Sequence, residues 1–178
     1  MKNIRNQKAY GALDLGSNNC RLLVAQRDAS GFKVIDSFSR IVRLGEGVSR
    51  NGILSDRAIG RTFDALKICK EKIKRNKVSR YRAVVTAACR QASNSQQFID
   101  YVFTELGIKL EIIDSEEESS LALEGCSSLL CSSVPNALIF DIGGCSTELI
   151  WVSLTELERP RIINWISLEC GVVSLVEQ

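Results

Sequence analysis

Two short segments of this sequence combine a carboxylate with small residues in a way that suits phosphate chemistry. In the more pronounced one, residues 137–152, Asp141 stands between two apolar runs and just before a turn of small residues, in the order ALIFDIGGCSTELIWV. An apolar run, a tight turn and a second apolar run predict a β-hairpin. A carboxylate at the mouth of such a turn, beside backbone N–H groups without bulky side chains over them, suits a metal-bound phosphate.

The same pattern occurs earlier in the chain. Residues 10–25 read YGALDLGSNNCRLLVA, and Asp14 aligns with Asp141 when the two segments are superimposed. Self-similarity at a long offset indicates two related units. We therefore expect two hairpins that face each other across a cleft and hold a polyanion with their turn residues. The candidate phosphate-binding turn residues are Gly16, Ser17, Asn18, Gly143, Gly144, Cys145 and Ser146.

Composition narrows the possible chemistry. The 178 residues are 45% hydrophobic and 25% charged, which is ordinary for a globular protein, and the net charge of +2 gives no strong overall field. Seven dispersed cysteines form no C-x-x-C pair and histidine is absent, so a structural zinc site is not expected and the thiols suit a reducing cytoplasm. Any general base must be a carboxylate, Lys, Tyr or Cys.

The chain shows no sign of a membrane segment or an exported leader. No stretch approaches 18 apolar residues, and the basic N-terminus has no long apolar run before Asp14. We therefore expect a cytoplasmic protein that associates with neither membrane nor nucleic acid.

Hydrophobic periodicity predicts an α/β protein with helices between and after the strands. Arg90 follows a predicted strand end, where ligand sites of open α/β sheets gather, so its guanidinium could clamp a phosphate. A run of glutamates, 116–118, fills the first turn of a helix. The helix dipole stabilises carboxylates there, so this run also has a purely structural explanation. Strands are expected at 10–15, 20–27, 33–40, 81–86, 110–113 and 162–168, and helices at 56–76, 94–106, 115–130 and from 172.

Six ordered motifs resemble one family. LDLGSNNCRLLVA, VRLGEGV, VVTAACRQASN, IIDSEEESSLALEG, FDIGGCSTEL and SLECGVVSLVE occur in the order and approximate spacing of the exopolyphosphatase/guanosine pentaphosphate phosphohydrolase family. The resemblance implies an actin-like ATPase (ribonuclease H-like) domain with a mixed sheet and flanking helices, over residues 8–133. The start of a second such domain would occupy residues 134–178.

The resemblance also implies roles for individual residues. Glu118 would activate the attacking water, with Glu117 as the next candidate, and Arg90 would bind phosphate. Asp141 would hold Mg²⁺ (or Mn²⁺), with help from Asp14, and Glu148 would orient metal-bound water. Cys145 replaces a glycine common in the family's turn; a positive φ there would strain it, whereas another conformation would tolerate a small thiol.

These features predict a metal-dependent hydrolase that releases terminal phosphate from inorganic polyphosphate or guanosine pentaphosphate. Family members run to around 300 residues or more, so the second domain would be incomplete, and a homodimer is expected only of a full-length form. Two alternatives stay open. One is an ATPase or kinase of the same superfamily, and the other is a truncated, non-catalytic relative that binds polyphosphate or a protein partner.

Overall fold

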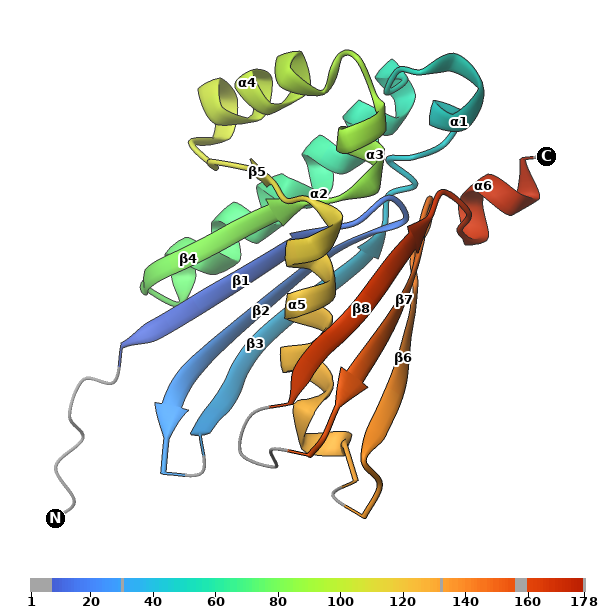
Figure 1. Ribbon diagram of the computed structural model, residues 1–178. Helices are drawn as coiled ribbons and strands as arrows, with labels where there is room; N and C mark the ends of the chain where they lie inside the picture. The colour runs from blue at the N-terminus through green and yellow to red at the C-terminus, as the bar shows by residue number, and fades with distance from the viewer. Residues whose placement is uncertain (1–7, 30, 132, 156–159, 178) are drawn as a thin grey trace, which may run out of the picture.

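Two β-sheets with a helix between them form the framework of the protein (Figure 1). The computed structural model describes residues 8–29, 31–131, 133–155 and 160–177. The elements are β1 (Ala9–Leu15), β2 (Asn19–Asp28), β3 (Gly31–Ile41), α1 (Val48–Asn51), α2 (Asp56–Arg75), β4 (Val78–Val85), α3 (Ala87–Gln91), α4 (Ser95–Leu106), β5 (Glu111–Ile112), α5 (Ser115–Cys126), the 3₁₀-helix η1 (Ser127–Leu129), β6 (Asn136–Ile142), β7 (Thr147–Ser153), β8 (Arg161–Leu168) and α6 (Val172–Val176).

The first sheet is mixed and has five strands in the order β3-β2-β1-β4-β5. Antiparallel pairing joins β1 to β2 and β2 to β3, whereas β4 and β5 run parallel to β1. The second sheet is antiparallel with the order β6-β7-β8. The expected mixed α/β fold class is therefore confirmed: a five-stranded mixed sheet with flanking helices is followed by strands that repeat its opening hairpin arrangement.

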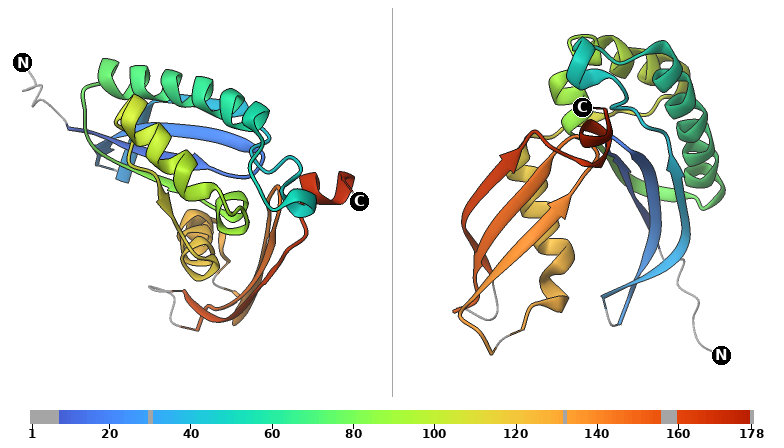
Figure 2. Two further views of the ribbon diagram at one scale, coloured as in Figure 1. Left: turned by 90° about the horizontal axis from the view of Figure 1, so that it is seen from above. Right: turned by 90° about the vertical axis from the view of Figure 1, so that its right-hand side faces the viewer.

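Burial of one face of the first sheet fixes the position of α2. Ser55 caps this helix, because its side chain accepts a hydrogen bond from the N–H of Ala58. The apolar positions of α2, which include Leu66 and Cys69, are buried against Leu22 and Val24 of β2 in a single core with α4. Figure 2 shows α2 and α4 on one face of this sheet and α5 on the other.

Helix α5 packs against the second sheet. Leu123 forms a separate small core with Ile150 and Val152 of β7, although the sequence places α5 with the first domain. The domain boundary predicted between residues 133 and 134 falls between η1 and β6, where the chain enters the second sheet.

Two short helices were not expected from the sequence. Helix α1 has left-handed glycines, Gly47 and Gly52, at its two ends, and α3 continues directly from the end of β4 after Thr86. Each has five residues or fewer, which is too short for helical periodicity to show. No described helix has both the length and the apolar character needed to cross a membrane.

Apolar side chains on the outer face of the second sheet are exposed, whereas those on the equivalent face of the first sheet are buried. Superimposing Asp141 on Asp14 places Phe140 at the position of Leu13; Leu13 is 1% exposed and Phe140 is 60% exposed. Direct cross-strand pairs share one face of a sheet, so Leu138, Phe140, Ile142, Leu149, Trp151, Ile166 and Leu168 lie together.

This difference gives a stability test of the repeat. Leu13→Ala should lower the free energy of unfolding by about 2–5 kcal/mol, because it leaves a cavity under α2. Phe140→Ala, at the matching position, should cost less than about 1 kcal/mol, because most of its ring is already in water. Urea unfolding followed by circular dichroism measures both. An equal loss in the two variants would show that the outer face is covered in solution.

Candidate active site

The two predicted hairpins meet turn to turn. Gly16 donates its N–H to the carbonyl of Asn19 at 2.9 Å, and Gly143 donates to the carbonyl of Ser146 at the same distance. The backbone bond is thus the same at equivalent positions of the two turns. In both hairpins the aspartate is the last strand residue but one, opposite Arg21 in β2 or Glu148 in β7.

Close backbone packing holds the turns together. A Cβ added at Gly144 would lie 2.9 Å from both the N of Asn18 and the Cβ of Ser17, so a side chain there has no room. The carbonyl of Ser17 accepts from Gly45, and that of Gly144 accepts from Val173 of α6, both at 2.8 Å. Backbone N–H groups of neighbouring segments therefore occupy these two carbonyls.

The N–H groups of the turns are arranged differently. Within the described part of the chain, no residue accepts a hydrogen bond from the N–H of Ser17, Asn18, Gly144 or Ser146. Successive unpaired N–H groups in a concave turn are typical of anion sites. Both turns therefore offer donors to a phosphate.

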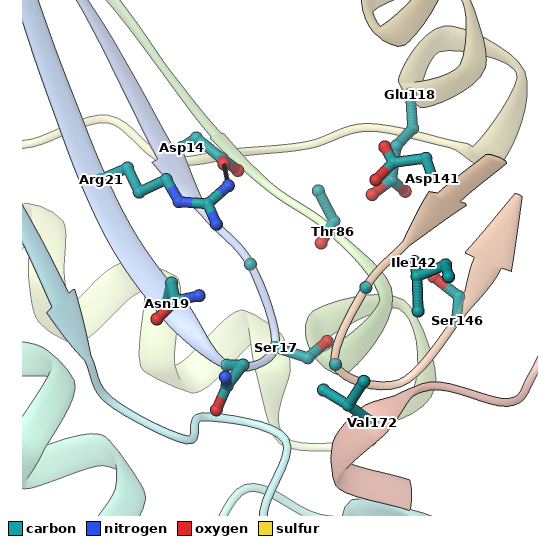
Figure 3. A pocket seen from close by; sticks show the side chains of 14 residues that line it. Asp14, Ser17, Asn19, Arg21, Thr86, Glu118, Asp141, Ile142, Ser146 and Val172 are labelled. Carbon is teal, nitrogen blue, oxygen red and sulfur yellow. Dashed lines mark ion pairs between the residues drawn. The ribbon is translucent and has the colours of Figure 1, made fainter. Parts of the chain in front are cut away.

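A cavity of about 150 Å³ lies between the hairpins (Figure 3). Its walls bring together three carboxylates, Asp14, Asp141 and Glu118, from β1, β6 and α5. In Figure 3, Glu118 lies beside Asp141, and Asp14 and Arg21 lie on the opposite side, with Thr86 between. The full lining is Asp14, Gly16, Ser17, Asn18, Asn19, Arg21, Thr86, Glu118, Asp141, Ile142, Gly143, Gly144, Ser146 and Val172.

The carboxylates of the cavity repel one another. Burial raises the pKa of Asp14, which Arg21 lowers and Asp141 raises further. Burial likewise raises the pKa of Glu118, which Arg90 lowers and the negative charges of Glu148 and Asp141 raise. A cation bound between these groups would relieve their repulsion.

The carboxylates of the cavity would fit Mg²⁺ or Mn²⁺ only together with water and phosphate oxygens. No group of three His, Cys, Asp or Glu side chains converges to hold a metal within the described ranges. Magnesium in phosphate-transfer sites usually keeps several waters and takes only one or two carboxylates together with substrate phosphate oxygens. Asp14 and Asp141, near the ends of the strands that lead into the two turns, would supply such a pair.

Four sequence-predicted site residues lie outside the cavity lining. Glu148 is 1% exposed, pairs directly with Asp141 on the same face of the second sheet, and accepts a hydrogen bond from Ser167 at 2.8 Å. Glu117 points instead to Arg82 at 2.6 Å. Arg90 donates to Glu118 at 2.7 Å. The fourth, Cys145, is buried with its Sγ 3.9 Å from the carbonyl of Gly45.

The strain considered for Cys145 does not arise. Among the described residues other than glycine, only Arg43 and Lys77 have positive φ. The thiol is accommodated because residue 45 is a glycine, where a Cβ would lie too close to Sγ. Burial raises the pKa of this thiol.

Sequence reasoning missed three polar groups of the lining, Asn19, Arg21 and Thr86. Arg21 forms an ion pair with Asp14 at 3.9 Å and is 60% exposed. The hairpin register contains the signal for Arg21, because a four-residue turn places it opposite Asp14. Thr86 follows β4 and is 8% exposed.

The contact of the turns can be tested without a substrate. Gly144→Ala should reduce the free energy of unfolding by about 1–3 kcal/mol, because the new methyl group overlaps the backbone of Asn18. Gly16→Ala is the matched control, since its Cβ would be 3.6 Å from the nearest atom. Denaturant unfolding of both variants measures the difference. A loss for Gly16→Ala as large as that for Gly144→Ala would contradict the close approach of the turns.

Comparisons with known proteins agree with this geometry. A guanosine-5'-triphosphate,3'-diphosphate pyrophosphatase of Aeromonas hydrophila is 32% identical over 167 residues, which are 94% of this chain and 33% of that protein. The solved exopolyphosphatase of Cytophaga hutchinsonii superimposes with a TM-score of 0.84 at 28% identity, over 96% of this chain and 53% of the other. The Aquifex aeolicus structure of the Ppx/GppA family gives a TM-score of 0.76 at 32% identity, over 96% and 54%.

The chain therefore spans about half the length of these solved relatives and a third of the curated one. The model of the Ppx/GppA phosphatase family matches residues 23–178, from within β2 to the end of the chain. The first turn, residues 16–18, precedes this range, but the alignments to the relatives above cover 94–96% of this chain and include it. By this match, the chain belongs to the Ppx/GppA phosphatase family.

Proposed function

We propose that the protein carries the phosphate-binding cleft of a metal-dependent phosphoanhydride hydrolase, which releases terminal phosphate from polyphosphate or guanosine pentaphosphate. One observation carries the proposal: two facing turns with unpaired N–H groups share a cavity with three carboxylates from three different elements. The names of the relatives, a guanosine pyrophosphatase and an exopolyphosphatase, support these two substrates. Both substrates present a terminal phosphoryl group.

Each part of the cavity has a role in this reaction. The N–H groups of the turns bind the phosphate oxygens, and Arg21 adds a positive charge at the same wall. Asp14 and Asp141 would hold Mg²⁺ or Mn²⁺, which neutralises the charge that develops on the phosphate oxygens. Phosphoryl transfer needs mainly positioning and charge neutralisation, and this set supplies both.

Glu118 is placed to accept a proton from the attacking water. The oxygen of that water bonds to the terminal phosphorus, the bridging P–O bond breaks, and the shortened chain leaves as the anion. A carboxylate that is partly buried and raised in pKa is a better base than a free one, since its affinity for the proton is higher. Glu148 lies directly opposite Asp141 and accepts from Ser167 through Oε1, so its other oxygen would orient metal-bound water.

Two adjacent glutamates allow a matched test. Glu118→Gln should lower phosphate release from long-chain polyphosphate with Mg²⁺ by about 100-fold or more, the usual effect of losing a general base. Glu117→Gln removes an equal charge from the neighbouring position, but Glu117 pairs with Arg82 and does not line the cavity, so its rate should stay close to wild type. A colorimetric phosphate assay compares the three proteins.

Two outcomes would contradict this assignment. Loss of turnover in Glu117→Gln with turnover preserved in Glu118→Gln would move the base. A folded wild-type chain that binds polyphosphate without releasing phosphate would instead favour the non-catalytic binder. The exposed apolar face of the second sheet favours the other form of this alternative, a relative that binds a protein partner, because such patches mark interaction surfaces.

A further inference from the structure

The resemblance implies that Arg90 binds phosphate, but the structure places its guanidinium elsewhere. Arg90 lies on α3 and is absent from the cavity lining, whereas Arg21 is part of it. The side chain of Arg90 is 21% exposed and that of Arg21 is 60% exposed. Of these two guanidinium groups, only that of Arg21 is therefore open to a ligand in the cavity.

Protein acceptors occupy Arg90. Its Nη1 donates to Oε2 of Glu118 at 2.7 Å and to the backbone carbonyl of Ile113 at 3.0 Å. Ile113 directly follows β5, and its own N–H donates to the carbonyl of Val85 at the end of β4. The guanidinium thus connects α3 to the segment that leads into α5, and a backbone hydrogen bond joins this segment to the end of β4.

The start of α5 separates Glu118 from its neighbour. Asp114 caps this helix by accepting from the N–H of Glu117 at 2.8 Å. Successive helical residues point in directions about 100° apart. Glu117 therefore turns outward to Arg82, and Glu118, which is 17% exposed, turns into the cavity beside Asp141.

The charges around Glu118 would push it away without Arg90. Asp141 on β6 and Glu148 on β7 both bring negative charge near this carboxylate. Arg90 on α3 forms the ion pair with Glu118 that opposes this repulsion. A charge-assisted hydrogen bond of this length is among the stronger side-chain contacts in proteins.

We infer that Arg90 is a positioning residue: it holds the carboxylate of Glu118 at the cavity wall and does not itself bind the substrate phosphate. The base role of Glu118 rests on the proposed function, whereas the Arg90–Glu118 contact does not. Loss of Arg90 should therefore reduce the rate of the chemical step and leave substrate affinity nearly unchanged.

Side-chain ¹⁵N NMR of the arginines tests the contact and the ligand together. In the free protein, Arg90 should give slowly exchanging guanidinium signals that are lost in Glu118→Gln and kept in Glu117→Gln. On addition of tripolyphosphate with Mg²⁺, Arg21 should shift strongly. Arg90 should shift no more than Arg61, whose guanidinium is bonded to the carbonyls of Val42 and Arg43.

Kinetics give an independent reading. Arg90→Gln should lower kcat for phosphate release by about 10- to 100-fold, because displacement of a catalytic group by about 1 Å can cost that much. KM should stay near the wild-type value, since a residue used only for positioning does not contribute to ground-state binding. Arg90→Lys should restore part of kcat, because it keeps the positive charge. Arg82→Gln, which frees Glu117 instead, is the control.

Several results would overturn the inference. One is a tripolyphosphate-induced shift of the Arg90 signals as large as that of Arg21. Another is a rise in KM with unchanged kcat in Arg90→Gln. The third is Arg90 guanidinium signals that remain the same in Glu118→Gln. If the wild-type chain neither binds tripolyphosphate nor releases phosphate, the proposed function fails. The comparison of Glu118→Gln with Glu117→Gln in the free protein still decides whether Arg90 holds Glu118.

Discussion

The backbone contact between two small-residue turns is the constraint on which the rest of the site depends. Gly144 packs against the main chain of Ser17 and Asn18 so closely that no side chain fits between them. Because each turn follows a strand that carries an aspartate, this contact brings Asp14 and Asp141 to one cavity. The helices and the two apolar cores hold the strands in the orientation that lets the turns meet.

The arrangement brings three carboxylates to the place where the proposed polyanion would bind, and a cation bound there would offset their repulsion. The negative charge of Asp141 raises the pKa of both Asp14 and Glu118, whereas the turns supply N–H donors for phosphate. Two arginines, Arg21 and Arg90, bring positive charge to these carboxylates. One faces the cavity and the other holds the glutamate. A metal-bound phosphate would satisfy both the carboxylates and the amides.

The sequence predicted the hairpins and their pairing well because the pattern around each aspartate is local and occurs twice. Side-chain directions were less accessible, since they depend on contacts between distant segments. Glu148 lies opposite Ser167 only in the β7–β8 register, and Arg90 reaches Glu118 only because α3 and α5 start beside the same strand ends. Arg21 could have been found from the turn length of the first hairpin. The conformation at Cys145 could not, because it depends on packing against Gly45.

Electron paramagnetic resonance of Mn²⁺ is the most direct test of the central claim that the two aspartates jointly hold a metal-bound phosphate. Free Mn²⁺ is titrated against the wild-type chain, Asp14→Asn, Asp141→Asn and the double variant, each with and without tripolyphosphate. We expect weak Mn²⁺ binding by the wild-type chain alone, much tighter binding with tripolyphosphate, and loss of that increase in either single variant. Equal Mn²⁺ binding by the wild-type chain and the double variant, with tripolyphosphate present, would contradict it.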